Sequence, residues 1–173
     1  GTGAVTWETS DSTVASINSQ TGRVEILKAG GPITITARKA AGGGYGETTA
    51  TYTFSAEKRP ATAIVTARSK PYDGGTTATL DISWKAGDLI NGDDITLSLT
   101  GAFDDANVGT DKIVRITLNG GLPDGGGKYA VTYNTTTTAS ITAQAATVSG
   151  VNAGPWTYSG SEQPLLSGGS ATN

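Results

Sequence analysis

The chain contains no cysteine, no methionine and no histidine among its 173 residues. Without cysteine it has no disulfide, no thiol nucleophile and no thiolate ligand for a metal. Without histidine it lacks the Ser-His-Asp triad and the usual ligand of zinc and iron. The absence of oxidisable sulfur suits a protein that works outside the cell. We therefore expect a chain that is not an enzyme and needs no cofactor.

Positive charge is also scarce. Twelve Lys and Arg residues stand against fifteen Asp and Glu, which leaves a net charge of −3. This balance provides no attraction for nucleic acid or for an anionic membrane. No apolar run is long enough to cross a bilayer, and no signal peptide is recognisable. Because the chain starts at Gly1 without methionine, we expect a processed product or a fragment of a larger protein.

Glycine and threonine are abundant instead, at 25 and 29 residues. Threonine suits a half-exposed pleated surface, and the apolar residues alternate at period two with no helical period. Short strands separated by Gly, Asn and Asp turns predict an all-β chain built from tandem Ig-like β-sandwich modules. The predicted strands cover residues 5–7, 13–17, 23–27, 33–37, 49–55, 63–67, 77–83, 94–99, 113–118, 129–133 and 139–143.

A Tyr-Asp-Gly motif at Tyr72, Asp73 and Gly74 returns 86 residues later as Tyr158, Ser159 and Gly160. In each copy we expect the ring to pack on the edge of a core, and the glycine to turn the chain with a positive φ. Two such copies at a domain-sized interval indicate a repeat. The expected units are 1–57, 58–144, and 145–173 as the opening strands of a further repeat.

The first 57 residues resemble the bacterial immunoglobulin-like domain of group 2. The resemblance rests on the run VTWETSDSTVASI from Val5 to Ile17, TGRV from residue 21, KAG from residue 28 and ITITA from residue 33. It implies a core role for Trp7. It also implies that the first strands of the sandwich are absent from this segment, or are supplied from elsewhere.

The second unit resembles the YDG domain of large repetitive bacterial surface proteins. The matching residues are KPYDG from residue 70, TTA from 76, GDDI from 92, Phe103, NVGTDK from 107 and KYAVT from 128. This resemblance implies a β-sandwich in an extracellular or bacterial cell-surface protein. Its expected partners are neighbouring repeats, copies of itself, or a host or cell-wall glycan or protein.

The sequence indicates three kinds of candidate site, and for each the same residues could instead have a purely structural role. Asp93, Asp94, Asp104 and Asp105 are candidate calcium ligands, although aspartate is common in turns for reasons of its own. Aromatic residues could stack on sugar rings or simply pack in the core; these are Trp7, Trp84, Trp156 and Tyr158. Lys70 and Lys112 are candidates for an isopeptide crosslink, against the usual solvated lysine.

The expected function is a stalk or spacer section of a large repetitive surface protein. One alternative is a filament subunit, in which the C-terminal strand region of one copy completes the N-terminal sandwich of the next. A second alternative is an adhesin module that binds a glycan or a protein.

Overall fold

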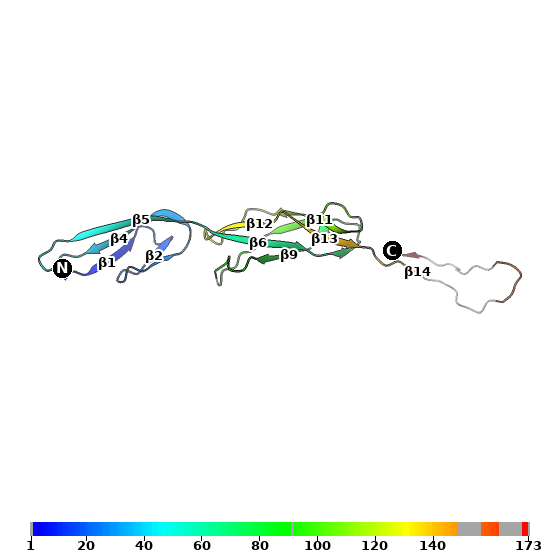
Figure 1. Cartoon of the computed structure of the whole chain (residues 1–173), viewed down its shortest axis with the longest axis horizontal. Helices are drawn as coiled ribbons and strands as arrows, with labels where there is room; N and C mark the ends of the chain where they lie inside the picture. The colour runs from blue at the N-terminus through cyan, green and yellow to red at the C-terminus, as the bar shows by residue number, and fades with distance from the viewer. Residues whose placement is uncertain (1, 91, 149–156, 163–170, 173) are drawn as a thin grey trace.

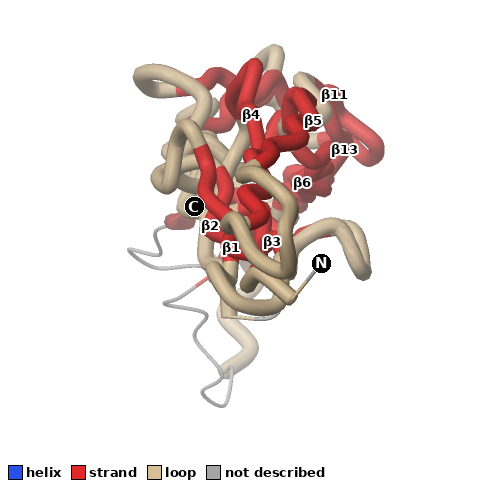
Figure 2. The backbone as a smooth tube through the Cα atoms, turned by 90° about the vertical axis from the view of Figure 1, so that its left-hand side faces the viewer, coloured by secondary structure: helices blue, strands red, loops and turns tan. Residues whose placement is uncertain are grey.

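The computed structural model describes residues 2–90, 92–148, 157–162 and 171–172. All regular elements in this part of the chain are β-strands, which confirms the predicted all-β class (Figures 1 and 2). None of the described residues belongs to a helix that is long and apolar enough to span a membrane. Strands β1–β5, here called the N-terminal unit, and β6–β13, the central unit, follow one another along the long axis (Figure 1).

The N-terminal unit contains a three-stranded sheet in the order β1-β4-β5 and a β2-β3 hairpin. Its strands are β1 (Val5–Thr9), β2 (Ala15–Ile17), β3 (Val24–Ile26), β4 (Gly30–Lys39) and β5 (Thr48–Ala56). Period-two alternation places Ile33 and Ile35 on one face of the sheet, where they form a small core with Ala15 of β2 and with Val14 just before it.

Strand β4 begins earlier than predicted. The predicted range starts at residue 33, whereas the strand itself starts at Gly30 and includes Pro32. The ladder with β5 shifts register between Gly30 and Ile33, so an irregularity absorbs the proline without ending the strand.

The central unit has two facing sheets. One is five-stranded, in the order β7-β13-β11-β10-β8, and the other three-stranded, in the order β12-β6-β9. Its strands are β6 (Arg59–Ala67), β7 (Lys70–Pro71), β8 (Thr77–Ala78), β9 (Leu80–Trp84), β10 (Leu99–Phe103), β11 (Gly109–Leu118), β12 (Tyr129–Tyr133) and β13 (Thr136–Thr142). Two strands begin earlier than predicted. Strand β6 starts at Arg59 instead of residue 63, because it pairs in parallel with β12. Strand β13 starts at Thr136 instead of residue 139, because it pairs in antiparallel fashion with β11.

The predicted strand 77–83 is divided between the two sheets. Residues 77–78 form β8 of the five-stranded sheet, and Leu80–Trp84 form β9 of the three-stranded sheet. The chain therefore changes sheets at Thr79. A strand that crosses from one sheet to the other is one way to form the corner of a sandwich.

The prediction of a strand at 94–99 was wrong for most of its length. Residues 93–98 join no ladder, and the strand β10 begins at Leu99. The alternation was nevertheless meaningful, because Ile95 and Leu97 are buried in the core beside Tyr129. Burial of every second residue requires only an extended segment with one face toward the core. A β-strand also requires a neighbouring strand that forms backbone hydrogen bonds with it.

Candidate functional site

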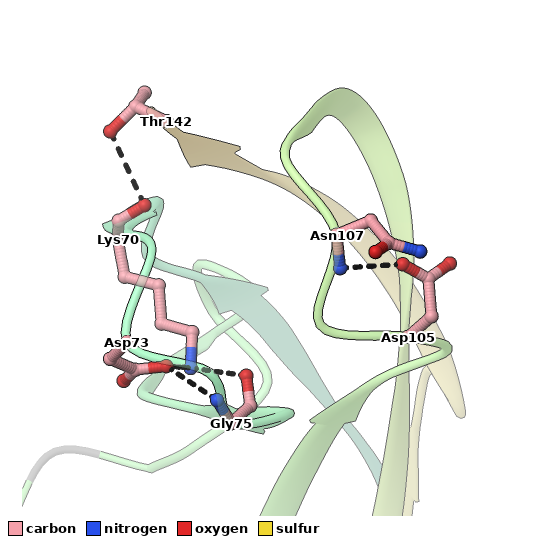
Figure 3. Close-up of polar contacts among 6 residues, drawn as sticks. All are labelled: Lys70, Asp73, Gly75, Asp105, Asn107 and Thr142. Carbon is pink, nitrogen blue, oxygen red and sulfur yellow. Dashed lines mark hydrogen bonds and ion pairs between the residues drawn. The ribbon is translucent and has the colours of Figure 1, made fainter. Parts of the chain in front are cut away.

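The Tyr-Asp-Gly motif forms a tight, internally bonded loop directly after strand β7 (Figure 3). The Lys70 ammonium donates to Asp73 Oδ1 and to the Gly75 carbonyl oxygen, each at 2.8 Å. Asp73 Oδ1 also accepts the Gly75 amide at 2.9 Å, and Gly74 has a φ of 76°. The motif therefore closes a turn on itself, with aspartate as the acceptor and glycine as the residue of positive φ.

This loop is attached to the body of the central unit by Lys70. The Lys70 ammonium lies 5.7 Å from the ring centroid of buried Phe103. Strand β7 pairs in parallel with the end of β13, and the Tyr72 amide donates to the Thr142 carbonyl oxygen at 2.8 Å. The hydrogen bond from Lys70, followed by that from the Gly75 amide, lowers the pKa of Asp73.

The two tyrosines of the motif and its echo lie at the surface. Tyr72 is 44% exposed and Tyr158 is 96% exposed. The echo keeps the turn, since Gly160 has a φ of 68° and Ser159 Oγ donates to the Ser161 carbonyl oxygen at 3.3 Å. In the same C-terminal region of the sequence, β14 (Thr147–Val148) pairs with β15 (Ala171–Thr172). The candidate Trp156 lies outside the described residues.

Three of the four candidate calcium ligands contact cationic side chains. Asp104 pairs with Arg115 at 2.9 Å, and Asp105 pairs with Lys112 at 2.6 Å. Asp105 also accepts the amide of Asn107 at 2.7 Å in an Asx turn (Figure 3). Within the described ranges, no three acidic side chains gather as a potential metal site. Of the two lysines considered for a crosslink, Lys112 pairs with Asp105 and Lys70 pairs with Asp73.

Asp93, the third paired candidate, helps to hold the central core. It accepts hydrogen bonds from Lys128 at 2.8 Å and from the hydroxyl of buried Tyr129 at 2.5 Å. The hydroxyl in turn accepts the amide of Ile90 at 2.9 Å. The Lys128 contact, with the Tyr129 hydroxyl as the second cause, lowers the pKa of Asp93, and the same pairing raises the pKa of Lys128. Asp93 thus satisfies a buried phenol.

Two tryptophans considered for sugar binding lie against cores. Trp84 packs on the cluster around Tyr129, and Trp7 packs on the cluster of the N-terminal unit. A Cβ added at Gly22 would come within 2.7 Å of the Trp7 ring, so this glycine provides the room for the indole. The Trp7 ring is nevertheless not sealed off from solvent.

An apolar depression opens on the inner face of the N-terminal sheet. It is lined by Trp7, Gly22, Val24, Ile35, Tyr52 and Phe54. Tyr52 and Phe54 follow one another on this face, with ring centroids 6.0 Å apart, and Tyr52 is 70% exposed. Alternation in the sequence places both rings on one face, but it does not reveal that this face remains open.

Comparison with known proteins identifies one part of the chain. Residues 57–138 match the family model of the YDG domain. No curated protein and no solved structure shows significant similarity. The match begins at the connection before β6 and ends within β13, so it covers most of the strands of both central sheets. The match to the YDG domain therefore lies on the central unit.

Proposed function

We propose that the chain is a stalk or spacer section of a large repetitive bacterial surface protein. The observation that carries this proposal is the end-to-end order of two β-units along one axis (Figure 1). Only Glu57 and Lys58 separate β5 from β6. A short connection between modules that have their own cores favours an extended, stiff arrangement. In this proposal the N-terminal unit is an Ig-like domain of group 2, and the location is extracellular.

Contacts at the joint support the proposal. The Ala29 amide of the N-terminal unit donates to the Gly127 carbonyl oxygen of the central unit at 2.9 Å. The Lys58 ammonium of the connection pairs with Asp124 at 2.9 Å, beside the same loop. Both partners of this ion pair are about half exposed, so the pair contributes little, whereas the backbone bond has directional geometry.

Small-angle X-ray scattering tests the stalk directly. An elongated pair-distance distribution with two separated modules is expected, together with no hydrolytic or transfer activity. A compact globular profile would contradict the proposal. The sequence of the larger protein to which this chain belongs in the proposal is expected to contain further repeats of the same type.

A filament subunit is the second candidate, and the open face of the N-terminal unit favours it. In this arrangement, the strand region 147–173 of one copy adds to the N-terminal sandwich of the next copy. A head-to-tail contact of this kind propagates into an open polymer. Deletion of residues 147–173 is then expected to abolish polymers; polymers that persist in the deletion variant would exclude this candidate.

An adhesin module that binds a glycan or a protein is the third candidate. The apolar depression beside Trp7 and Tyr52 favours it, because aromatic faces pack on the apolar side of sugar rings. Screening on a glycan array is its test. A Tyr52→Ala variant that keeps every glycan signal would contradict binding at this place.

A further inference from the structure

Strand β5 is an edge strand whose outer side is open. In the sheet order β1-β4-β5 it has a neighbour on one side alone, and of its nine residues only Phe54 and Ala56 are partly buried. It is the longest edge strand in the part of the chain that the structure describes. The opposite edge is partly occupied, because the Trp7 amide of β1 donates to the Ser19 carbonyl oxygen at 3.0 Å.

The sequence of β5 lacks the charged residues and the proline that often protect an edge strand. Natural edge strands avoid association through such residues or through short length. Residues 48–56 read TTATYTFSA, without a charged residue, proline or glycine. Edge strand β9 of the central unit, by contrast, carries Asp81 in an ion pair with Arg68 at 2.6 Å. The open edge of β5 is therefore suited to a further strand.

The two faces of β5 specify what kind of strand fits. Ala50, Tyr52 and Phe54 lie on the inner, apolar face, since their partners across the β4 ladder are Ala37, Ile35 and Ile33. The outer face carries hydroxyl groups, and the Thr53 hydroxyl is bonded to that of Thr34 at 2.9 Å. A matching strand needs the same alternation of apolar and hydroxyl residues and no charge. The sequence of β5 itself has this pattern.

We propose that β5 pairs in antiparallel fashion with β5 of a second copy, with Tyr52 on the two-fold axis. This register pairs all nine residues. In it, Tyr52 would face Tyr52 of the second copy, the larger Phe54 would face the small Ala50, and Thr51 would face Thr53. Aromatic and threonine pairs across strands are both stabilising. The product is a six-stranded sheet in a closed dimer, and this inference is independent of the stalk role.

The elongated shape permits this dimer. Strand β5 leads into β6 along the long axis of the chain (Figure 1). Antiparallel pairing therefore directs the two central units away from each other, without overlap. Beyond β5, this register places Glu47 of one copy, which is ion-paired with Arg38 at 2.6 Å, opposite Glu57 of the other copy.

A charge-swap experiment on the full chain tests the proposal. Wild-type protein is expected to show twice the 17.4 kDa chain mass in concentration-dependent sedimentation equilibrium. Tyr52→Lys and Tyr52→Glu are each expected to weaken the dimer about tenfold or more, since the aromatic pair is replaced by like charges on the axis. Mixing the two variants is expected to restore a heterodimer, because residue 52 then meets the opposite charge. Circular dichroism confirms that each variant is folded.

Two controls separate this dimer from other contacts. Tyr45 is 71% exposed and lies before β5, so Tyr45→Lys is expected to leave the dimer intact. Deletion of residues 147–173 is also expected to leave it intact. A monomeric wild type, or a mixture of the two position-52 variants that stays monomeric, would overturn the proposal. Loss of the dimer on tail deletion would assign the open edge to the tail instead, and would likewise overturn it.

Discussion

The Ala29 amide and the Gly127 carbonyl oxygen join the N-terminal and central units through a hydrogen bond of 2.9 Å. Gly127 lies in the loop before β12 and has a φ of 90°. The bond attaches the end of one unit to a glycine loop of the next, so it restricts rotation about the two-residue connection. In the proposed stalk, such a joint would transmit orientation as well as distance.

The first prediction concerns this joint. Ala29→Pro removes the amide donor, at a cost of about 1 kcal/mol for one backbone hydrogen bond. The two units are expected to stay folded while the scattering profile broadens toward a range of inter-unit angles. Lys58→Ala, which removes only the exposed ion pair with Asp124, is the control and is expected to leave the profile unchanged. Equal profiles for Ala29→Pro and wild type would show that the bond does not hold the joint.

The second prediction concerns Gly22, whose φ is 71° and whose added Cβ would approach the Trp7 ring to 2.7 Å. Gly22→Ala is expected to destabilise the N-terminal unit by about 2–4 kcal/mol, through backbone strain and overpacking together. Gly44→Ala is the matched control, since Gly44 has a φ of 84° with nothing within 4 Å of an added Cβ. Urea unfolding measures both. Equal losses of stability would mean that the indole moves aside freely.

The third prediction separates the two functions of Asp73 in the motif loop. Asp73→Asn keeps an oxygen acceptor for the Gly75 amide but loses the charge opposite Lys70, whereas Asp73→Ala loses both contacts. We expect a larger decrease in melting temperature for Asp73→Ala than for Asp73→Asn. The measurement is differential scanning calorimetry. Equal decreases for the two variants would indicate that the ion pair, rather than the turn, organises the loop.

The fourth prediction is a loss of stability in acid. Six aspartates have lowered pKa values because they accept hydrogen bonds from cations, hydroxyls or backbone amides in the folded chain; they are Asp11, Asp73, Asp81, Asp93, Asp105 and Asp124. A lowered pKa means that the unfolded state binds more protons, so the stability present above the unfolded value, about 4, falls as the pH drops through the folded values.

Asp93→Asn provides the control for this acid loss. The variant removes one titrating group, so its stability is expected to decrease less steeply between pH 4 and pH 2 than that of wild type, from a lower starting value. Urea midpoints at a series of pH values measure the slope. An identical slope for the variant and the wild type would show that protonation of Asp93 does not contribute to the loss of stability in acid.

The fifth prediction concerns calcium. Because Asp93, Asp104 and Asp105 already pair with Lys128, Arg115 and Lys112, a calcium ion would have to displace these cations. Calcium also needs six to eight oxygens in one place. We therefore expect the melting temperature to be the same in calcium, magnesium and chelator. A rise specific to calcium would restore the metal hypothesis.

The strands themselves could largely be predicted from alternation and turn residues. Thr48–Ala56 and Tyr129–Tyr133 read as strands because apolar and hydroxyl residues alternate there. Residues 93–98 show the limit of this reasoning. They bury Ile95 and Leu97 as a strand would, yet they join no ladder, because a neighbour must also present a free backbone edge.

The candidate site likewise has a part that the sequence predicts and a part that it does not. The turn at Asp73 and Gly74 follows from local chemistry. It needs only an aspartate that accepts the amide two residues later, here that of Gly75, and a glycine between the two. The Asp93 contact with Tyr129 spans 36 positions and has no local signal. The sequence therefore identified the aspartate but not its use.

The sequence alone determined the all-β class, the absence of thiol and imidazole side chains, and the similarity of residues 57–138 to the YDG domain, because these depend on composition, period and local motifs. Tertiary structure decided which edges and faces are covered. Strand β5 has the same alternation whether or not a neighbour pairs with it, and only the three-dimensional arrangement shows that Tyr52 remains exposed at an open edge. Burial is a property of what packs against a residue, and that partner is distant in sequence.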